Sequence, residues 1–70
     1  MKISTTKLNK ELEKIANAVE KREEQFENRS EKWQEGEAGE AFQERTSELS
    51  QIEDDLQAAI EALEAWNEEN

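Results

Sequence analysis

Hydrophobic residues recur along this chain at alternating intervals of four and three, which is the spacing of a heptad repeat. The first half contains one series of such positions: Leu8, Leu12, Ile15, Val19, Phe26 and Trp33. The second half contains another: Phe42, Leu49, Ile52, Leu56, Ala59, Leu63 and Trp66. The pattern predicts two helices, each with one hydrophobic side.

The glycines Gly36 and Gly39 separate the two series and predict a turn at about residues 36–39. The first helix is then expected at about residues 5–35 and the second at about residues 38–68. Ser4 is the candidate N-cap of the first helix, and a left-handed Gly36 would end it.

Reversal at the glycines brings together residues whose numbers add up to about 75. Trp33 then meets Phe42 at the turn, and Leu8 meets Trp66 at the open end. The sequence therefore predicts an all-α fold, an antiparallel two-helix hairpin that forms one domain, residues 1–70. A single long helix is the rival, although each central glycine would cost it about 1 kcal/mol. Disorder is the other alternative at this charge content, and the strict periodicity argues against it.

Small and hydrophobic residues widen the hydrophobic side of both helices at the open end. We therefore expect a second copy to pack there, giving a homodimer that forms a four-helix bundle. The residues expected in this interface, or in contact with a different protein, are Leu8, Leu12, Ile60, Leu63 and Trp66. The alternative for Trp66 is that it closes the open end over Leu8.

Three arginines, Arg22, Arg29 and Arg45, occupy positions of the hydrophobic series. Each lies three or four residues from an aromatic residue, a spacing that allows cation–π contacts. The expected pairs are Arg22 with Phe26, Arg29 with Trp33, and Arg45 with Phe42. Arg22 is also expected opposite Glu53. These arginines either set the helix register or contact a partner.

Acidic residues are concentrated in the second half of the chain. Residues 1–36 contain eight lysines and arginines and eight acidic residues, whereas residues 37–70 contain one arginine and eleven acidic residues. Two interpretations are open: a solvated side that keeps the protein in solution, or a surface that binds a basic partner. The candidate partner-binding residues are Glu40, Glu44, Glu48, Asp54, Asp55 and Glu61. The same charge argues against direct binding to nucleic acid, because phosphate neutralisation needs a basic face.

The chain has no cysteine and no histidine, which excludes disulfides, ordinary zinc and iron sites and the usual catalytic triads. Neither glycine belongs to a phosphate-binding loop, since no strand precedes it and no "GK[ST]" follows. We expect a protein that is not an enzyme and that binds no metal and no cofactor. No secretory signal and no membrane span is visible, which favours a cytoplasmic location.

One segment carries a motif made of Phe26, Arg29, Ser30, Trp33 and Gln34, followed by Gly39 and Glu40. It resembles the F-x-x-R-S-x-x-W-Q pattern of small acidic helical proteins encoded by bacteriophages and prophages, although Gly36 stands where that pattern has a serine. The resemblance implies a phage origin, and hence the cytoplasm of a bacterial host, rather than an activity. Phage accessory proteins often act by binding a host protein.

These observations lead to two functional hypotheses. The first is a non-enzymatic interaction protein whose acidic helix binds, and so inhibits or regulates, a basic host protein that handles nucleic acid. Carboxylates one helical turn apart lie about 6 Å from each other, which is similar to the phosphate repeat of a nucleic-acid strand. The alternative is a homo-oligomeric helical bundle with a structural or assembly role and no mimicry of nucleic acid.

Overall fold

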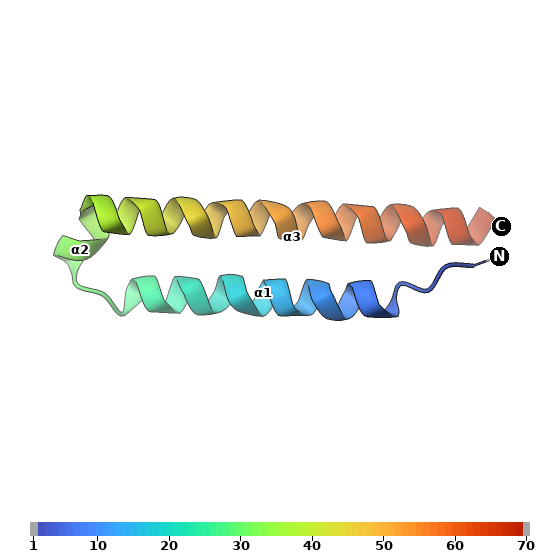
Figure 1. Ribbon diagram of the computed structural model, residues 1–70, viewed down its shortest axis with the longest axis horizontal. Coiled ribbons are helices and arrows are strands. Elements are labelled where there is room, and N and C mark those ends of the chain that lie inside the picture. The colour runs from blue at the N-terminus through green and yellow to red at the C-terminus, as the bar shows by residue number, and fades with distance from the viewer. Residues whose placement is uncertain (1, 70) are drawn as a thin grey trace.

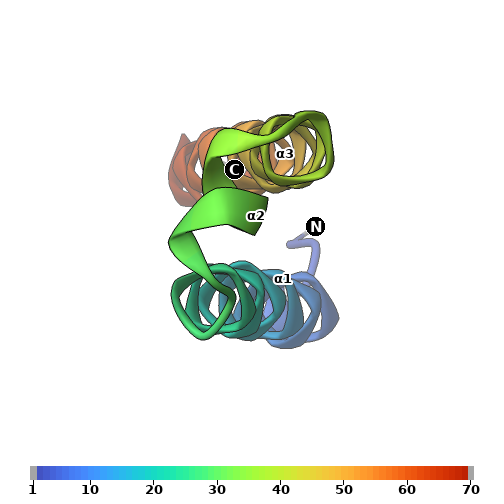
Figure 2. The same cartoon turned by 90° about the vertical axis from the view of Figure 1, so that its left-hand side faces the viewer.

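The computed structural model describes residues 2–69, and within this range it is all-helical, which confirms the predicted class. Its elements are α1 (Thr6–Glu27), α2 (Glu31–Glu35) and α3 (Glu37–Glu69). The helices α1 and α3 lie side by side and run in opposite directions, and α2 lies across one end (Figure 1, Figure 2). Residues 1 and 70, which the predicted domain includes, lie outside the described residues.

The N-cap of α1 is Thr5, whose side chain makes no capping hydrogen bond, so the prediction that Ser4 is the N-cap is wrong by one residue. The Ser4 hydroxyl nevertheless accepts a hydrogen bond from the Thr6 amide at 3.3 Å. This bond satisfies one of the amide groups that the first helical turn leaves without a partner.

The end of α1 lies at Glu27, so the prediction of one helix reaching about residue 35 is wrong. The Asn28 amide still donates to the Glu24 carbonyl at 3.0 Å, and then the Ser30 backbone becomes extended. No glycine or proline marks this break. It occurs because the Ser30 hydroxyl accepts a hydrogen bond from the Trp33 amide at 3.3 Å and so begins α2.

Gly36 joins α2 to α3 with φ −83° and ψ 178°, so the prediction of a left-handed glycine is wrong. The Gly36 carbonyl accepts a hydrogen bond from the Glu40 amide at 3.0 Å, which opens α3. Gly39 lies within α3 and is buried. A Cβ there would collide with the carbonyl oxygens of Trp33 and Gln34, so Gly39 is needed for close packing of α2 on α3.

The corner, residues 28–36, is longer than the predicted turn and changes which residues face each other. Residue numbers add up to 68 for the facing pairs Arg22–Thr46 and Phe26–Phe42, and to 70 for Ile3–Asn67. The predicted sum of about 75 is therefore wrong, and Leu8 lies about level with Ile60 instead of Trp66.

The molecule is long and thin, with principal extents of 55 × 15 × 10 Å. Its radius of gyration is 16.4 Å, whereas a globular chain of this length has about 11 Å. Among the described residues, Val19 and Ile60 are the only buried hydrophobic side chains. A single contact line between two helices thus leaves most hydrophobic side chains partly exposed.

Candidate functional site

Three aromatic rings hold the corner against both long helices. The ring centroids of Phe26 and Trp33 are 6.0 Å apart, those of Phe26 and Phe42 are 6.4 Å apart, and those of Trp33 and Phe42 are 5.7 Å apart. Aromatic pairs at such distances stabilise a fold beyond the effect of their burial. The expected meeting of Trp33 and Phe42 is confirmed, as is the cation–π contact of Arg29, whose guanidinium carbon is 4.2 Å from the Trp33 ring centroid.

Gln34 ties the corner to the end of α1. Its Nε2 donates hydrogen bonds to the carbonyls of Phe26 at 2.9 Å and Arg29 at 3.0 Å. Carbonyls at a helix end lack helical partners, so these bonds act as a cap. Together with the Ser30 cap and the ring contacts of Trp33, they give each of the first five motif residues a structural role in the corner.

Arg22 lies in the seam, the line of contact between α1 and α3. Its Nε donates to Thr46 Oγ1 at 2.9 Å, and its Nη2 donates to the Phe42 carbonyl at 3.1 Å. The guanidinium carbon is 4.0 Å from the Phe42 ring centroid. The predicted facing of Glu53 is wrong, because the longer corner brings Phe42 and Thr46 to this level, and the guanidinium contacts the Phe42 ring in place of the predicted Phe26 ring.

Heptad spacing through the buried and half-buried residues defines the seam positions of each helix, with the exposed Leu8 continuing the spacing at the open end. In α1 they are Leu8, Leu12, Ile15, Val19, Arg22 and Phe26, as predicted. In α3 they are Phe42, Thr46, Leu49, Glu53, Leu56, Ile60, Leu63 and Asn67. Half of the α3 set is therefore shifted by one residue from the predicted series, which placed Arg45, Ile52, Ala59 and Trp66 against the first helix.

Arg45 shows this shift most clearly. Its side chain is 76% exposed, and its Nη1 lies 3.3 Å from Glu48 Oε2, one turn along α3. The predicted seam position of Arg45 and its contact with Phe42 are therefore wrong. The guanidinium that lies over the Phe42 ring is that of Arg22.

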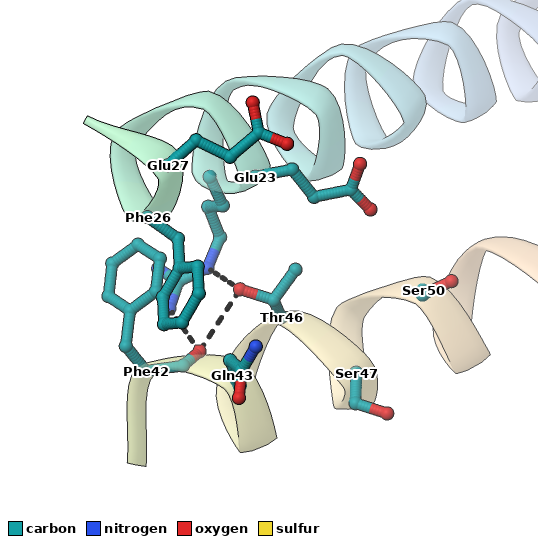
Figure 3. Close-up of a pocket in the computed structure, with 9 residues that line it drawn as sticks. Glu23, Phe26, Glu27, Phe42, Gln43, Thr46, Ser47 and Ser50 are labelled. Carbon is teal, nitrogen blue, oxygen red and sulfur yellow. Dashed lines mark hydrogen bonds between the residues drawn. The ribbon is translucent and has the colours of Figure 1, made fainter. Parts of the chain in front are cut away.

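A groove of about 510 Å³ beside Arg22 shows which sides of the two helices share a face (Figure 3). Glu23 and Glu27 line it from α1, and Gln43 and Ser47 line it from α3. All four directly follow a seam position. Because each residue turns a helix by about 100°, residues that follow seam positions lie on this side and residues that precede them lie on the other.

We call the groove side the glutamate face. Its acidic residues are Glu13, Glu20, Glu23 and Glu27 of α1 and Glu40, Asp54, Glu61, Glu64 and Glu68 of α3. No lysine or arginine in α1 or α3 directly follows a seam position. The glutamate face is thus strongly negative along both helices.

We call the opposite side the lysine face. From α1 it carries Lys7, Lys14 and Lys21, seven residues apart, together with Glu11, and from α3 it carries Glu48, Ile52, Asp55, Ala59 and Trp66, together with Arg45. Ile52 is 52% exposed and Trp66 is 45% exposed. This face therefore combines an exposed hydrophobic line on α3 with a basic edge on α1 and an acidic edge on α3.

The acidic residues predicted to bind a partner do not share one surface. They divide among the glutamate face (Glu40, Asp54 and Glu61, at heptad intervals with Ser47), the lysine face (Glu48 and Asp55) and the back of α3 (Glu44). Three of the six predicted residues, Glu44, Glu48 and Asp55, therefore point away from the glutamate face.

The residues predicted as a hydrophobic interface also divide. Ile60 is 3% exposed, so it packs inside the seam and is not an outer contact residue. Leu12 and Leu63 are half-buried in the seam, whereas Leu8 at 36% and Trp66 at 45% are exposed.

Two residues that position these faces were not singled out from the sequence, Thr46 and Asn67, and Gln34 was noted only as a member of the motif, without a predicted role. Thr46 and Asn67 belong to one heptad series with Glu53 and Ile60. This series is more polar than the neighbouring Ile52, Ala59 and Trp66 series, so hydrophobicity alone favours the wrong one. The even spacing of Lys7, Lys14 and Lys21 was a readable signal for the lysine face.

Among residues 2–69, no group of three or more acidic residues is arranged to hold a metal ion. No described helix is long and apolar enough to cross a membrane. Comparison of the chain with protein-family models, with curated proteins and with solved structures finds no match.

Proposed function

We propose that this chain is a non-enzymatic interaction protein, a helical hairpin that pairs with a second copy to form a four-helix bundle. The observation that carries the pairing is surface area. The single chain exposes 5679 Å², whereas a globular protein of its mass, 8.1 kDa, exposes about 4,500 Å². Covering this excess on two chains would bury about 2,400 Å², which is within the range of obligate homodimers.

The hydrophobic line on the lysine face is where this pairing is proposed to occur. Seam packing uses the more polar series of α3, with Thr46, Glu53 and Asn67, and leaves Ile52, Ala59 and Trp66 outside. Because burial of hydrophobic area drives association, a second copy gains most by covering the exposed series.

Light scattering over a concentration series tests the pairing, with Ile52→Lys as the disrupting variant. Ile52 is exposed, so the substitution leaves the hairpin folded and is expected to yield a monomer at concentrations where the parent is a dimer. Gln57→Lys is the matched control, since it introduces the same charged side chain on the glutamate face without removing a hydrophobic one. A parent protein that stays monomeric at high micromolar concentration contradicts the proposal.

The glutamate face is the proposed binding surface for a basic protein. It carries carboxylates from both helices, and pairing through the lysine face leaves it exposed in each copy. In keeping with the resemblance to phage proteins, the proposed partner is a nucleic-acid-handling protein of a bacterial host. Binding to such a positive surface is expected to weaken as salt rises.

Capture from a bacterial lysate with a salt gradient tests this surface, using neutralised variants as the comparison. Glu20→Gln with Glu61→Gln removes charge from the glutamate face, whereas Glu37→Gln with Glu44→Gln removes the same charge from the back of α3, where these two residues lie seven positions apart. The first pair is expected to elute a basic partner at lower salt, and the second pair at unchanged salt. Equal elution of both variants contradicts a role for the glutamate face.

An assembly role without mimicry of nucleic acid is the second candidate, and the exposed Ile52 and Trp66 side chains favour it. In that case, neutralising the glutamate face leaves all binding unchanged, and Ile52→Lys removes it.

A further inference from the structure

We infer that the second copy packs with its α1 on the lysine face of α3, about a two-fold axis parallel to the helices. Both corners then lie at the same end of the bundle. This inference rests on the proposed pairing and adds its geometry. In this arrangement each α3 contacts two α1 helices, its own along the seam and that of the second copy along Ile52, Ala59 and Trp66.

The alternative two-fold axis is perpendicular to the helices. It would place α1 on α1 and α3 on α3, with the corners at opposite ends. The basic edge of one copy would then run along the basic edge of the other, and the acidic edge along the acidic edge, with Glu11 and Arg45 as the only opposite charges among the described residues of these edges. Like charges in direct opposition are unfavourable and exclude wrong pairings.

The parallel axis instead brings opposite charges to the same height, because rotation about it moves no residue along the helices. Facing residue numbers near the corner add up to 68, so Lys14 is level with Asp54 and Lys21 is level with Ser47. Asp55 and Glu48, one residue further on, point to the lysine face. Lys14 of one copy therefore meets Asp55 of the other, and Lys21 meets Glu48.

The ion pairs that these residues form within one chain do not oppose this exchange. Lys14 Nζ lies 3.3 Å from Glu11 Oε1, with side-chain exposures of 74% and 60%. Glu48 pairs with Arg45 at 3.3 Å, again at the surface. Exposed pairs of this kind contribute little to stability, so their partners can change on association.

Distance measurement between spin labels distinguishes the two axes, and the absence of cysteine from the chain allows a single labelled site per copy. A label at Glu35→Cys reports the corner. With the parallel axis, the labels are separated by the width of a four-helix bundle, under about 30 Å. With the perpendicular axis, they approach the 55 Å length of the molecule.

A second label at Gln57→Cys, near the middle of α3, reports pairing itself. Short distances at both sites support the parallel arrangement. A short distance at residue 57 with a long one at residue 35 overturns it and keeps the proposed dimer. No dipolar coupling at either site overturns the dimer and the arrangement together.

Charge exchange tests the contacts. Lys14→Gln with Lys21→Gln is expected to raise the dimer Kd about tenfold, because four cross-copy pairs are lost. Gln43→Glu with Ser47→Glu, the same change of net charge on the glutamate face, is expected to leave Kd within about twofold. Exchanging both lysines to Glu and both Glu48 and Asp55 to Lys should restore the parent Kd. Equal effects of the first two variants, or no recovery in the exchanged protein, overturn the inference.

Discussion

The Arg22 guanidinium lies over the Phe42 ring and donates a hydrogen bond to the carbonyl of the same residue. One arginine thus joins α1 to both the side chain and the backbone of α3. Thr46 completes the arrangement, since its hydroxyl accepts from Arg22 Nε and donates to the Phe42 carbonyl at 3.0 Å. A charged residue at a seam position therefore fixes which residues face each other, as buried polar residues do in coiled coils.

Replacing Arg22 by Met is expected to lower the free energy of unfolding by about 1–3 kcal/mol, because the stem is kept and the hydrogen bonds and cation–π contact are lost. Arg22→Lys should fall between parent and Met, since one ammonium cannot reach both acceptors in the geometry of a guanidinium. Urea unfolding followed by circular dichroism measures both. Arg45→Met is the control and should change stability by less than about 0.5 kcal/mol, as its ion pair is exposed. Equal losses at both arginines would contradict the seam role.

The two glycines are expected to respond in opposite ways to alanine. Gly39→Ala places a Cβ against the carbonyl oxygens of Trp33 and Gln34, so it should destabilise by about 1–3 kcal/mol. At Gly36 the nearest atom to a Cβ is 3.4 Å away and φ is −83°, which any residue adopts. Gly36→Ala should therefore stabilise by about 0.4–1 kcal/mol through the unfolded chain. Thermal unfolding of the two variants decides, and a larger loss at Gly36 would refute the close approach of α2 at Gly39.

Gln34→Glu is expected to be more harmful than Gln34→Ala, although glutamate has nearly the same shape. The carboxylate would turn an oxygen toward the carbonyls of Phe26 and Arg29, to which Gln34 now donates. Both hydrogen bonds from Gln34 would be lost, and a carboxylate oxygen would face the two carbonyl oxygens. This should lower the free energy of unfolding by about 1–3 kcal/mol. Gln43→Glu gives the same chemical change on an exposed part of α3. If chemical unfolding shows that Gln34→Ala is less stable than Gln34→Glu, this hydrogen-bond assignment is contradicted.

The helical class and the α1 seam could be predicted because the heptad spacing of Leu12, Ile15 and Val19 admits only one buried side. The corner could not be predicted in this way. It begins where it does because the Ser30 side chain caps α2, although the same residue could also have continued α1. Periodicity carries no information on such local competition between a side chain and the helix.

The faces of α3 were harder to predict for a different reason. Its hydrophobic arc is wide enough for two neighbouring helices, because Leu49, Leu56 and Leu63 lie between the Ile60 series and the Ile52 series. Hydrophobicity alone predicts that the Ile52 series packs against α1, whereas the geometry of the corner places the Ile60 series in the seam. The error is informative, because the series left outside is the one that a second copy is proposed to cover.

Asn67 holds the segment before α1 against the end of α3, and its loss is expected to free that segment alone. Its Oδ1 accepts from the Ile3 amide at 2.8 Å, and its Nδ2 donates to the Ile3 carbonyl at 2.6 Å. Asn67→Asp keeps the acceptor but replaces the donor with an oxygen that faces the carbonyl. Since one such bond is worth about 1 kcal/mol, the Ile3 amide should exchange with solvent at least about fivefold faster, whereas the amides of Val19 and its neighbours keep their rates. Asn17→Asp, the same change on the exposed side of α1, should leave Ile3 unaffected, and equal rates in the two variants would show that Asn67 does not hold the segment.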